Sequence, residues 1–222
     1  MTYLSWAALF EGASDETYFE LLIPRVMEDI IVTRGTRHST IPPTPAIRLK
    51  RDTVEVVARE ACNAKDAFHL LFIHSDTGGR NVETALEERS GRYCEAMHAI
   101  CDWPPVRCIT IAPRHETEAW ILADPDAVTA APGYVGSPGS IGLPGNAIEA
   151  ERLVDRKSAL ATAVNQVRGR RRPFSAKQMF PAIAQRQSLV KPRVATSFAA
   201  FEVDLVAARA SLGCIDPLNP RT

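Results

Sequence analysis

Hydrophobic residues in the first 125 positions occur in short continuous runs that alternate with stretches of helical periodicity. Four apolar runs predict buried strands, at residues 3–10, 46–50, 67–74 and 106–113. Apolar residues spaced three and four apart predict helices, at residues 14–30, 53–64, 81–100 and 117–124. Strands that alternate with helices are typical of a Rossmann-like open α/β sheet with mainly parallel strands.

A Gly- and Pro-rich segment, PGYVGSPGSIGLPGN, interrupts this pattern at residues 132–146. Such a composition is typical of a connector between domains. We therefore predict an α/β domain at residues 1–131 and a basic helical extension at residues 147–222. Within the extension, the apolar positions predict three helices, at residues 147–167, 175–187 and 196–212.

The composition is that of a globular protein, since 45% of the 222 residues are hydrophobic and 23% are charged. No apolar run approaches the ~20 residues that cross a bilayer, and the N-terminus lacks the basic start of a signal peptide. The five cysteines are scattered without the spacing of a disulfide framework. These features predict a protein of the reducing cytoplasm without a membrane partner.

Charge is unevenly distributed although the formal net charge is zero. Residues 1–150 hold 13 Lys and Arg against 21 Asp and Glu, a net charge of −8, whereas residues 151–193 hold 11 against 2, a net charge of +9. An acidic front half beside a basic segment suits a carboxylate metal site next to an anion-binding surface. The alternative is that basic helices dock on an acidic domain.

Acidic residues follow three of the predicted strands. Glu11 follows the first strand, Asp76 follows LLFIH, Glu116 and Glu118 follow CITIAP, and Asp15 lies four residues beyond Glu11. Ligands of open α/β sheets bind at the carboxyl ends of the strands, so we expect these carboxylates in one crevice. Carboxylate oxygens suit Mg²⁺ or Mn²⁺, and two such ions would clamp the attacking and leaving oxygens of a phosphodiester. The alternative is that these residues only cap helices and form turns.

Two stretches carry a resemblance to a known family. EGASDETYF after a strand, followed later by LLFIHSDTGG, resembles the TOPRIM domain of topoisomerases, primases and overcoming-lysogenization-defect nucleases. ETEAWILADP and the later DRKSAL resemble a bacterial TOPRIM-like family often encoded beside an ATPase in phage-defence loci. The resemblance covers roughly residues 3–125 and 150–160.

The resemblance implies a role for each acidic residue. Glu11, Asp76 and Glu118 would hold Mg²⁺ or Mn²⁺, while Asp15 and Glu116 would complete a second metal site or orient water. The chain departs from the family pattern where Asp-x-Asp is expected, because its sequence there is His-Ser-Asp, residues 74–76. His74 can ligate a transition metal such as Mn²⁺ but adds no negative charge, which leaves open a degenerate, inactive domain.

Basic residues of the extension are candidates to bind phosphate. The resemblance implies that Lys157, in DRKSAL, steadies a scissile phosphate; otherwise it is an ordinary surface lysine. The run VRGRRRPF predicts a nucleic-acid contact because guanidinium groups form forked hydrogen bonds to phosphates. A solvated helix end is the alternative. The candidate contact residues are Arg168, Arg170, Arg171 and Arg172.

Other types of site have weaker support. Cys94, His98, Cys101 and Cys108 suggest zinc, but no Cys-x-x-Cys pair is present and the first three have the spacing of a core-facing helix. HSDTGG lacks the Gly-Lys-Ser/Thr ending of a Walker A loop, and no strand is followed by Gly-x-Gly-x-x-Gly. The chain is therefore not expected to be an ATPase or a dehydrogenase, and any ATP would be bound by a partner.

The sequence thus favours a metal-dependent nuclease of DNA or RNA that acts in anti-phage defence with an ABC-type ATPase. One alternative is a catalytically degenerate TOPRIM-like subunit that docks on the ATPase and regulates it. A third, more remote alternative is a phosphoryl-transfer or primase-like enzyme, for which no nucleotide pocket is identifiable.

Overall fold

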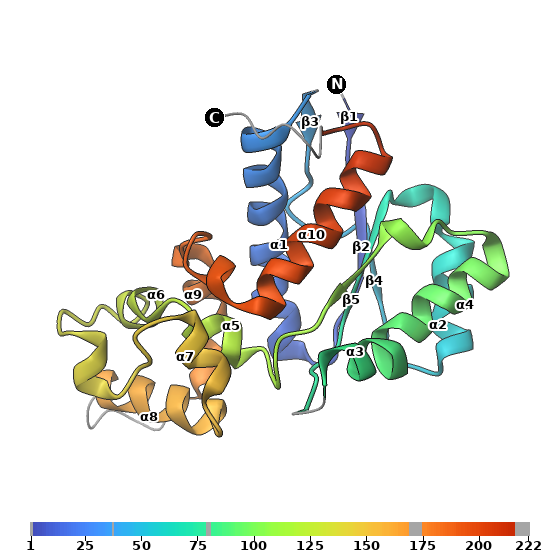
Figure 1. Cartoon of the computed structure of the whole chain (residues 1–222). Helices are drawn as coiled ribbons and strands as arrows, with labels where there is room; N and C mark the ends of the chain where they lie inside the picture. Colours follow the sequence, from blue (N-terminus) through green and yellow to red (C-terminus); the bar gives the residue numbers. More distant parts are fainter. Residues whose placement is uncertain (1, 37, 79–80, 169–174, 216–222) are drawn as a thin grey trace.

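A computed structural model describes residues 2–36, 38–78, 81–168 and 175–215 of the chain. Four parallel strands form its central sheet, in the order β4–β2–β5–β6 (Figure 1). They are β2 (Trp6–Leu9), β4 (Ile47–Leu49), β5 (Leu70–His74) and β6 (Cys108–Ile111). Two further short strands, β1 (Thr2–Tyr3) and β3 (Ser39–Thr40), pair separately. The predicted open α/β sheet of parallel strands is confirmed.

Helices cover both faces of the sheet because its strands bury side chains on both sides. Leu70 and Phe72 of β5 join a core with α1 (Ala13–Arg34) and α10 (Thr196–Ser211). The intervening Leu71 and Ile73 join a second core on the opposite face, with α2 (Val54–Asn63) and α4 (Gly91–Cys101). The strands therefore read as continuous apolar runs, as expected for a parallel sheet covered on both faces.

The predicted helix at residues 81–100 is not a single α-helix. It consists of α3 (Val82–Ala85), a π-helical turn η2 (Leu86–Ser90) and then α4. π-Helical turns occur within α-helices and are frequent at functional sites. The short 3₁₀ turns of the chain are η1 (Lys65–Ala67), η3 (Pro105–Arg107), η4 (Pro138–Ile141), η5 (Ala176–Met179) and η6 (Pro192–Val194).

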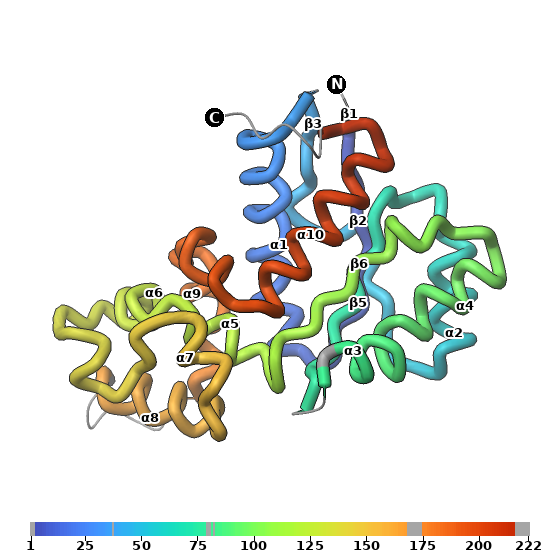
Figure 2. The backbone as a smooth tube through the Cα atoms, viewed as in Figure 1, coloured from blue at the N-terminus to red at the C-terminus, as the bar shows by residue number. Residues whose placement is uncertain are grey.

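A helical lobe stands beside the sheet at the end where β6 terminates (Figure 2). The predicted helix at 147–167 is two helices, because Leu153–Asp155 interrupts it. The lobe contains α5 (Glu118–Leu122), α6 (Pro125–Ala130), α7 (Ala147–Arg152), α8 (Arg156–Arg168) and α9 (Phe180–Arg186).

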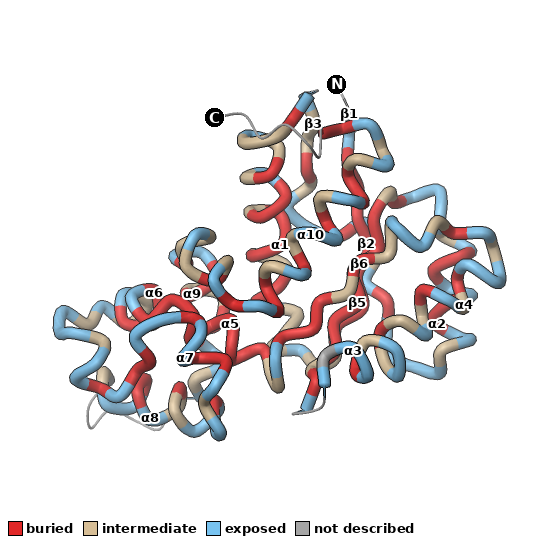
Figure 3. The backbone as a smooth tube through the Cα atoms, in the orientation of Figure 1, coloured by how far each residue is buried: buried red, intermediate tan, exposed pale blue. Residues whose placement is uncertain are grey.

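The predicted division of the chain stays a prediction, and residues on both sides of it contribute to one core. The predicted connector contributes Ile141 and Leu143 to the main core, and α10 returns to the sheet to pack on β6. Buried residues lie both in the sheet and in the lobe, and Arg114 is exposed between them (Figure 3). Residues 147–222 therefore supply both the lobe and one of the helices that cover the sheet.

Buried polar contacts join the lobe to α10. Glu151 is only 4% exposed, and its carboxylate accepts hydrogen bonds from the backbone N–H groups of Thr196 and Ser197 (3.2 and 3.1 Å). The Ser197 hydroxyl also donates to Glu151 and accepts from the indole N–H of Trp120 at 2.8 Å. A buried carboxylate with several hydrogen bonds is firmly held, so the lobe is fixed relative to the sheet.

Four of the five cysteines form disulfides, although the sequence predicted a reducing compartment. Cys62 of α2 is joined to Cys101 of α4, and Cys94 of α4 is joined to Cys108 of β6. Cys214 is free and buried. The pairs were not predicted because their separations, 39 and 14 residues, resemble no disulfide framework. Cytoplasmic localisation stays a prediction, and none of the described helices is long and apolar enough to cross a membrane.

Candidate active site

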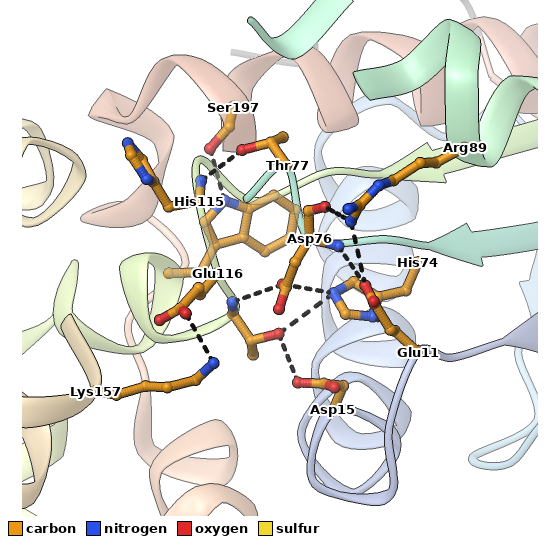
Figure 4. A network of polar contacts seen from close by, with 12 residues as sticks. Glu11, Asp15, His74, Asp76, Thr77, Arg89, His115, Glu116, Lys157 and Ser197 are labelled. Atoms are coloured by element: carbon orange, nitrogen blue, oxygen red, sulfur yellow. Dashed lines mark hydrogen bonds and ion pairs between the residues drawn. The ribbon is translucent and has the colours of Figure 1, made fainter. Parts of the chain in front are cut away.

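The carboxyl ends of β2, β5 and β6 lie level with one another. The strand register places Leu9 beside Ile73 and His74 beside Ile111. Residues just after these strands, together with the first turn of α1, therefore gather at one edge of the sheet. Figure 4 shows the resulting polar cluster, which includes predicted site residues from both halves of the chain: Glu11, Asp15, His74, Asp76, Glu116 and Lys157.

Thr117 joins three of the segments that form the cluster. Its backbone N–H donates to Oδ1 of Asp76 at 3.0 Å, and its hydroxyl donates to Oδ1 of Asp15 at 2.7 Å. Thr117 is fully buried. The sequence analysis did not identify this residue, because a threonine at the start of a helix carries no distinctive signal. It orients two of the predicted metal ligands.

His74 orients its neighbours instead of presenting a free nitrogen to a metal. The backbone N–H of Glu11 donates to Nδ1 at 3.3 Å, so this nitrogen acts as an acceptor and the ring proton is assigned to Nε2. Nε2 lies 3.3 Å from both Oδ1 of Asp76 and the Thr117 hydroxyl. The side chain is 0% exposed. The geometry thus gives His74 a positioning role, and its predicted role as a metal ligand stays a prediction.

Glu11 lies between the Asp76 backbone and two arginines. Its Oε2 accepts a hydrogen bond from the N–H of Asp76 at 2.9 Å, and its Oε1 is 3.6 Å from Nη1 of Arg51. Nη1 of Arg89 is 3.9 Å from Oε2 and donates to the carbonyl of Asp76 at 2.5 Å. Arg51 follows β4 by two residues, so the strand-end rule applied to that strand would have found it. Arg89 has no comparable sequence signal.

Lys157 lies beside the acidic residues, although α8 is far along the chain from the strands. Its ammonium group is 2.7 Å from Oε1 of Glu116. Burial acts to lower the pKa of Lys157, but the hydrogen bond to Glu116 and the charges of Glu118, Glu116 and Asp76 raise it overall. Lys157 therefore stays protonated and supplies a positive charge at the cluster. The predicted role of Lys157 beside a scissile phosphate stays a prediction.

Glu118 is the most buried of the candidate carboxylates, with 5% of its surface exposed. Burial raises its pKa to about 7, and Glu116 and Asp76 add to this effect, whereas its own backbone N–H and Lys157 oppose it. A cation next to Glu118 would offset the cost of burying its negative charge.

The loops after β5 and β6 are fastened to each other beside the cluster. The N–H of His115 donates to the Thr77 hydroxyl at 2.6 Å, and the N–H of Gly78 donates to the His115 carbonyl at 3.0 Å. His115 has a φ of 70°, a conformation that is uncommon for a residue with a side chain. Such backbone conformations persist where surrounding contacts enforce them and are concentrated at functional sites.

The acidic side chains have the type of ligand atom that a hard cation needs, but they are not arranged around a common point. Asp15 and Asp76 each use Oδ1 for the contacts described above, which leaves Oδ2 for another ligand. All the acidic candidates offer the oxygen ligands that Mg²⁺ and Mn²⁺ prefer. Within the ranges that the structure describes, however, no group of three His, Cys, Asp or Glu side chains is close enough to hold an ion.

A groove of about 640 Å³ opens from the cluster toward the helical lobe. Glu11, Asp15 and Asp76 line it on the sheet side, and Lys177 of η5 lies on the lobe side. Lys177 is exposed and was not identified from the sequence, because a single lysine has no distinguishing pattern. The groove gives the carboxylates access to a large ligand.

The remaining sequence-based candidates have different outcomes. Arg170, Arg171 and Arg172, together with the side chain of Arg168, lie outside the described residues. Three of the four zinc candidates are the disulfide-bonded Cys94, Cys101 and Cys108, so they offer no free thiolate. Nδ1 of the fourth, His98, is 3.1 Å from the carbonyl of Trp103. The zinc site is therefore not supported.

No family model matches the chain, and no curated protein or solved structure matches it either. The assignment of a function consequently depends on the geometry of the site and on the motifs that resemble the TOPRIM family.

The raised pKa of Glu118 predicts a specific pH dependence of stability. Because the pKa is higher in the folded than in the unfolded state, protonated Glu118 favours folding below pH 4.5, and this contribution is lost as the pH rises through about 7. We expect it to amount to about 3 kcal/mol. Urea unfolding with a chelator present should show this decline for the wild type and not for Glu118→Gln. If the free energy of unfolding depends on pH in the same way in both proteins, folding does not raise the pKa of Glu118, and the prediction is wrong.

Proposed function

We propose that this chain is a TOPRIM-like, metal-dependent nuclease that hydrolyses phosphodiester bonds of DNA or RNA. The observation that carries the proposal is the meeting of Glu11, Asp15 and Asp76 with Lys157 at the carboxyl ends of parallel strands. Glu118 is close enough for its charge to interact with Asp76 and Lys157. These residues come from four separate segments, and turns or helix caps would not require them to meet. Oxygen ligands beside a protonated lysine suit a divalent cation and a phosphate.

Each residue of the cluster has a role in this proposal. Glu11, Asp76 and Glu118 would hold Mg²⁺ or Mn²⁺, with Asp15 and Glu116 completing a second site or orienting water. A bound cation would lower the pKa of the attacking water and stabilise negative charge on the phosphate. Lys157 would place a positive charge beside the scissile phosphate, and Thr117 and His74 hold the carboxylates in position.

The biological setting is a further part of the proposal. We propose that the nuclease is the effector of a bacterial anti-phage defence system and that an ABC-type ATPase is its partner. The support is the resemblance of ETEAWILADP and DRKSAL to a family encoded beside ATPases, together with the lack of a Walker A loop in this chain. The cytoplasm is the compartment in which such a system acts.

The second candidate function is a non-catalytic subunit that docks on the ATPase and regulates it. It is favoured by one observation, namely that His74 occupies the position of an acidic ligand and uses both ring nitrogens within the fold. With one anionic ligand fewer, the cluster would bind a divalent cation more weakly than an Asp-x-Asp site.

Binding and cleavage measurements on the purified protein separate the two functions. Mn²⁺ should bind the wild type, as followed by electron paramagnetic resonance, and should bind Asp76→Asn at least about tenfold more weakly, because a metal ligand is lost. Incubation with Mn²⁺ and a mixture of tRNA, single-stranded DNA and plasmid should then yield fragments with the wild type. A third measurement tests whether the immobilised chain retains the ATPase. If Mn²⁺ binds neither protein, no substrate is cut and the ATPase is retained, the regulatory function replaces the nuclease.

A further inference from the structure

A second cavity adjoins Glu11 on the side that faces α2 and α4. It has a volume of about 240 Å³. Three arginines line it, Arg51 after β4, Arg89 in the π-helical turn η2 and Arg92 in α4. The acidic residues of its lining are Glu11 and Glu88, so basic side chains outnumber acidic ones.

The three arginines differ in how far the fold already uses them. Arg89 is fixed by its hydrogen bond to the Asp76 carbonyl, and Arg51 faces Glu11 at 3.6 Å. Arg92 is exposed and makes no hydrogen bond or ion pair with any other residue that the structure describes. Arg51 and Arg89 balance the negative charge of Glu11, but Arg92 has no such role.

The helix geometry presents these residues to the cavity as a set. Arg89 and Arg92 lie three positions apart across the end of the π-helical turn, and Tyr93 follows Arg92 in the same lining. Residues three and four apart share one helix face, so the two guanidinium groups point toward the same space. π-Helical turns are frequent at functional sites.

Ser75 supplies an independent observation. It is 9% exposed, it belongs to the lining of the cavity, and its buried hydroxyl has no hydrogen-bond partner within the described ranges. Buried hydroxyl groups are nearly always paired in folded proteins, so an unpaired one indicates a missing partner such as a ligand.

We propose that this cavity binds a phosphate group of a polynucleotide strand next to the phosphate that is cleaved. The inference rests on the proposed function, because it takes the carboxylates around Glu11 as the place of cleavage. Guanidinium groups bind phosphate oxygens through paired hydrogen bonds, and a hydroxyl adds a further donor. Glu11 lines both the cavity and the groove beside α1, so a strand that crosses Glu11 has its backbone in both.

Arg92→Ala is the decisive variant, because Arg92 contacts none of the carboxylates and its exposed side chain is not needed for folding. Arg59→Ala is the matched control, since Arg59 is an exposed arginine of α2 that lines none of these cavities. Binding of a fluorescent single-stranded oligonucleotide would be measured in EDTA at several salt concentrations, with inorganic phosphate as a second probe. Urea unfolding of both variants confirms their folding.

Arg92→Ala should bind the oligonucleotide about tenfold more weakly, the effect of losing one charge-assisted hydrogen bond. The slope of log K against log salt should fall by about 0.7, as expected for one phosphate contact on a single strand. Arg59→Ala should bind as the wild type does. Equal losses in the two variants, or no loss in Arg92→Ala, would overturn the inference. If Arg92→Ala weakens the binding of inorganic phosphate but not that of the oligonucleotide, the cavity binds a free anion. The inference that it binds a polynucleotide strand would then be overturned.

Failure of this inference is distinguishable from failure of the proposed function, because binding in EDTA requires no cleavage. Metal-dependent cleavage with no dependence on Arg92 would reject the phosphate cavity alone. Binding that depends on Arg92, with no cleavage in Mn²⁺, would reject the nuclease and leave a polynucleotide-binding subunit.

Discussion

Glu11→Gln is expected to reduce metal-dependent cleavage by at least about 100-fold, since even residues that only support a metal ligand commonly contribute 10- to 100-fold. The amide oxygen of Gln can still accept the hydrogen bond from the Asp76 backbone, so the fold should be retained. What the substitution removes is the negative charge that a divalent cation requires. Cleavage rates in Mn²⁺, measured together with urea unfolding, would check both expectations.

The matched control is Glu16→Gln, which also removes one negative charge, from a residue in the first turn of α1. Glu16 pairs with Arg48 at 3.2 Å and contacts none of the candidate site residues. Its loss should leave cleavage unchanged. A Glu11→Gln variant that cleaves at the wild-type rate would exclude Glu11 from the site. Equal losses in both variants would show that general charge, and not a specific ligand, controls the activity.

Loss of the Cys62–Cys101 disulfide is expected to lower the free energy of unfolding by about 4 kcal/mol. The two residues are 39 apart in sequence, and closing a loop of that length restricts the unfolded chain by about this amount. The Cys94–Cys108 pair closes a shorter loop, with a separation of 14, and should contribute about 3 kcal/mol. Urea unfolding of Cys62→Ala/Cys101→Ala beside the oxidised wild type measures the first value.

The reduced wild type is the control for the cysteine variants, because it retains the buried sulfur atoms but lacks the cross-links. Both reduced protein and variant should unfold at lower urea concentration than the oxidised protein. Mass spectrometry of peptides prepared without reductant should find the Cys62–Cys101 and Cys94–Cys108 pairs. Five free thiols in the native protein would contradict the pairing and would agree with the original prediction of a reducing compartment.

The strands and most helices were predictable because the hydrophobic pattern determines them locally. LLFIH is apolar at every position but its last, and the structure buries all five residues of β5 between two helical layers. The position of α10 was not predictable in this way. Its apolar face indicated only that it packs on something, and the partners on β6 and α1 are set by long-range packing.

The candidate site shows the same limit. Glu11 and Asp76 were identified because they follow buried strands, and parallel strands place their carboxyl ends together. His74 was assigned as a metal ligand because the sequence gives the residue type without the partners of its ring nitrogens. Arg51 could have been found in the same way, because it follows β4 by two residues. Thr117, Arg89 and Lys177 take part through distances and angles, which a single sequence does not specify.

Lys157 illustrates how the two parts of the protein cooperate. It belongs to α8 of the helical lobe, whereas the carboxylates belong to loops and helix starts at the sheet. The buried contacts of Glu151 with Thr196 and Ser197 hold the lobe in the orientation that brings the lysine to Glu116. A fragment restricted to residues 1–131 would lack both Lys157 and α10.

The most direct test of the account is a single time course of cleavage with one internally labelled strand. This strand is the nucleic acid that is cut in the mixture of tRNA, single-stranded DNA and plasmid. The purified wild type is incubated first without metal, then with Mn²⁺, and finally with excess EDTA. The account predicts no cleavage in the first stage, cleavage on addition of Mn²⁺, and arrest on addition of EDTA. An intact strand throughout the Mn²⁺ stage, or cleavage that continues unchanged in EDTA, would contradict a metal-dependent nuclease.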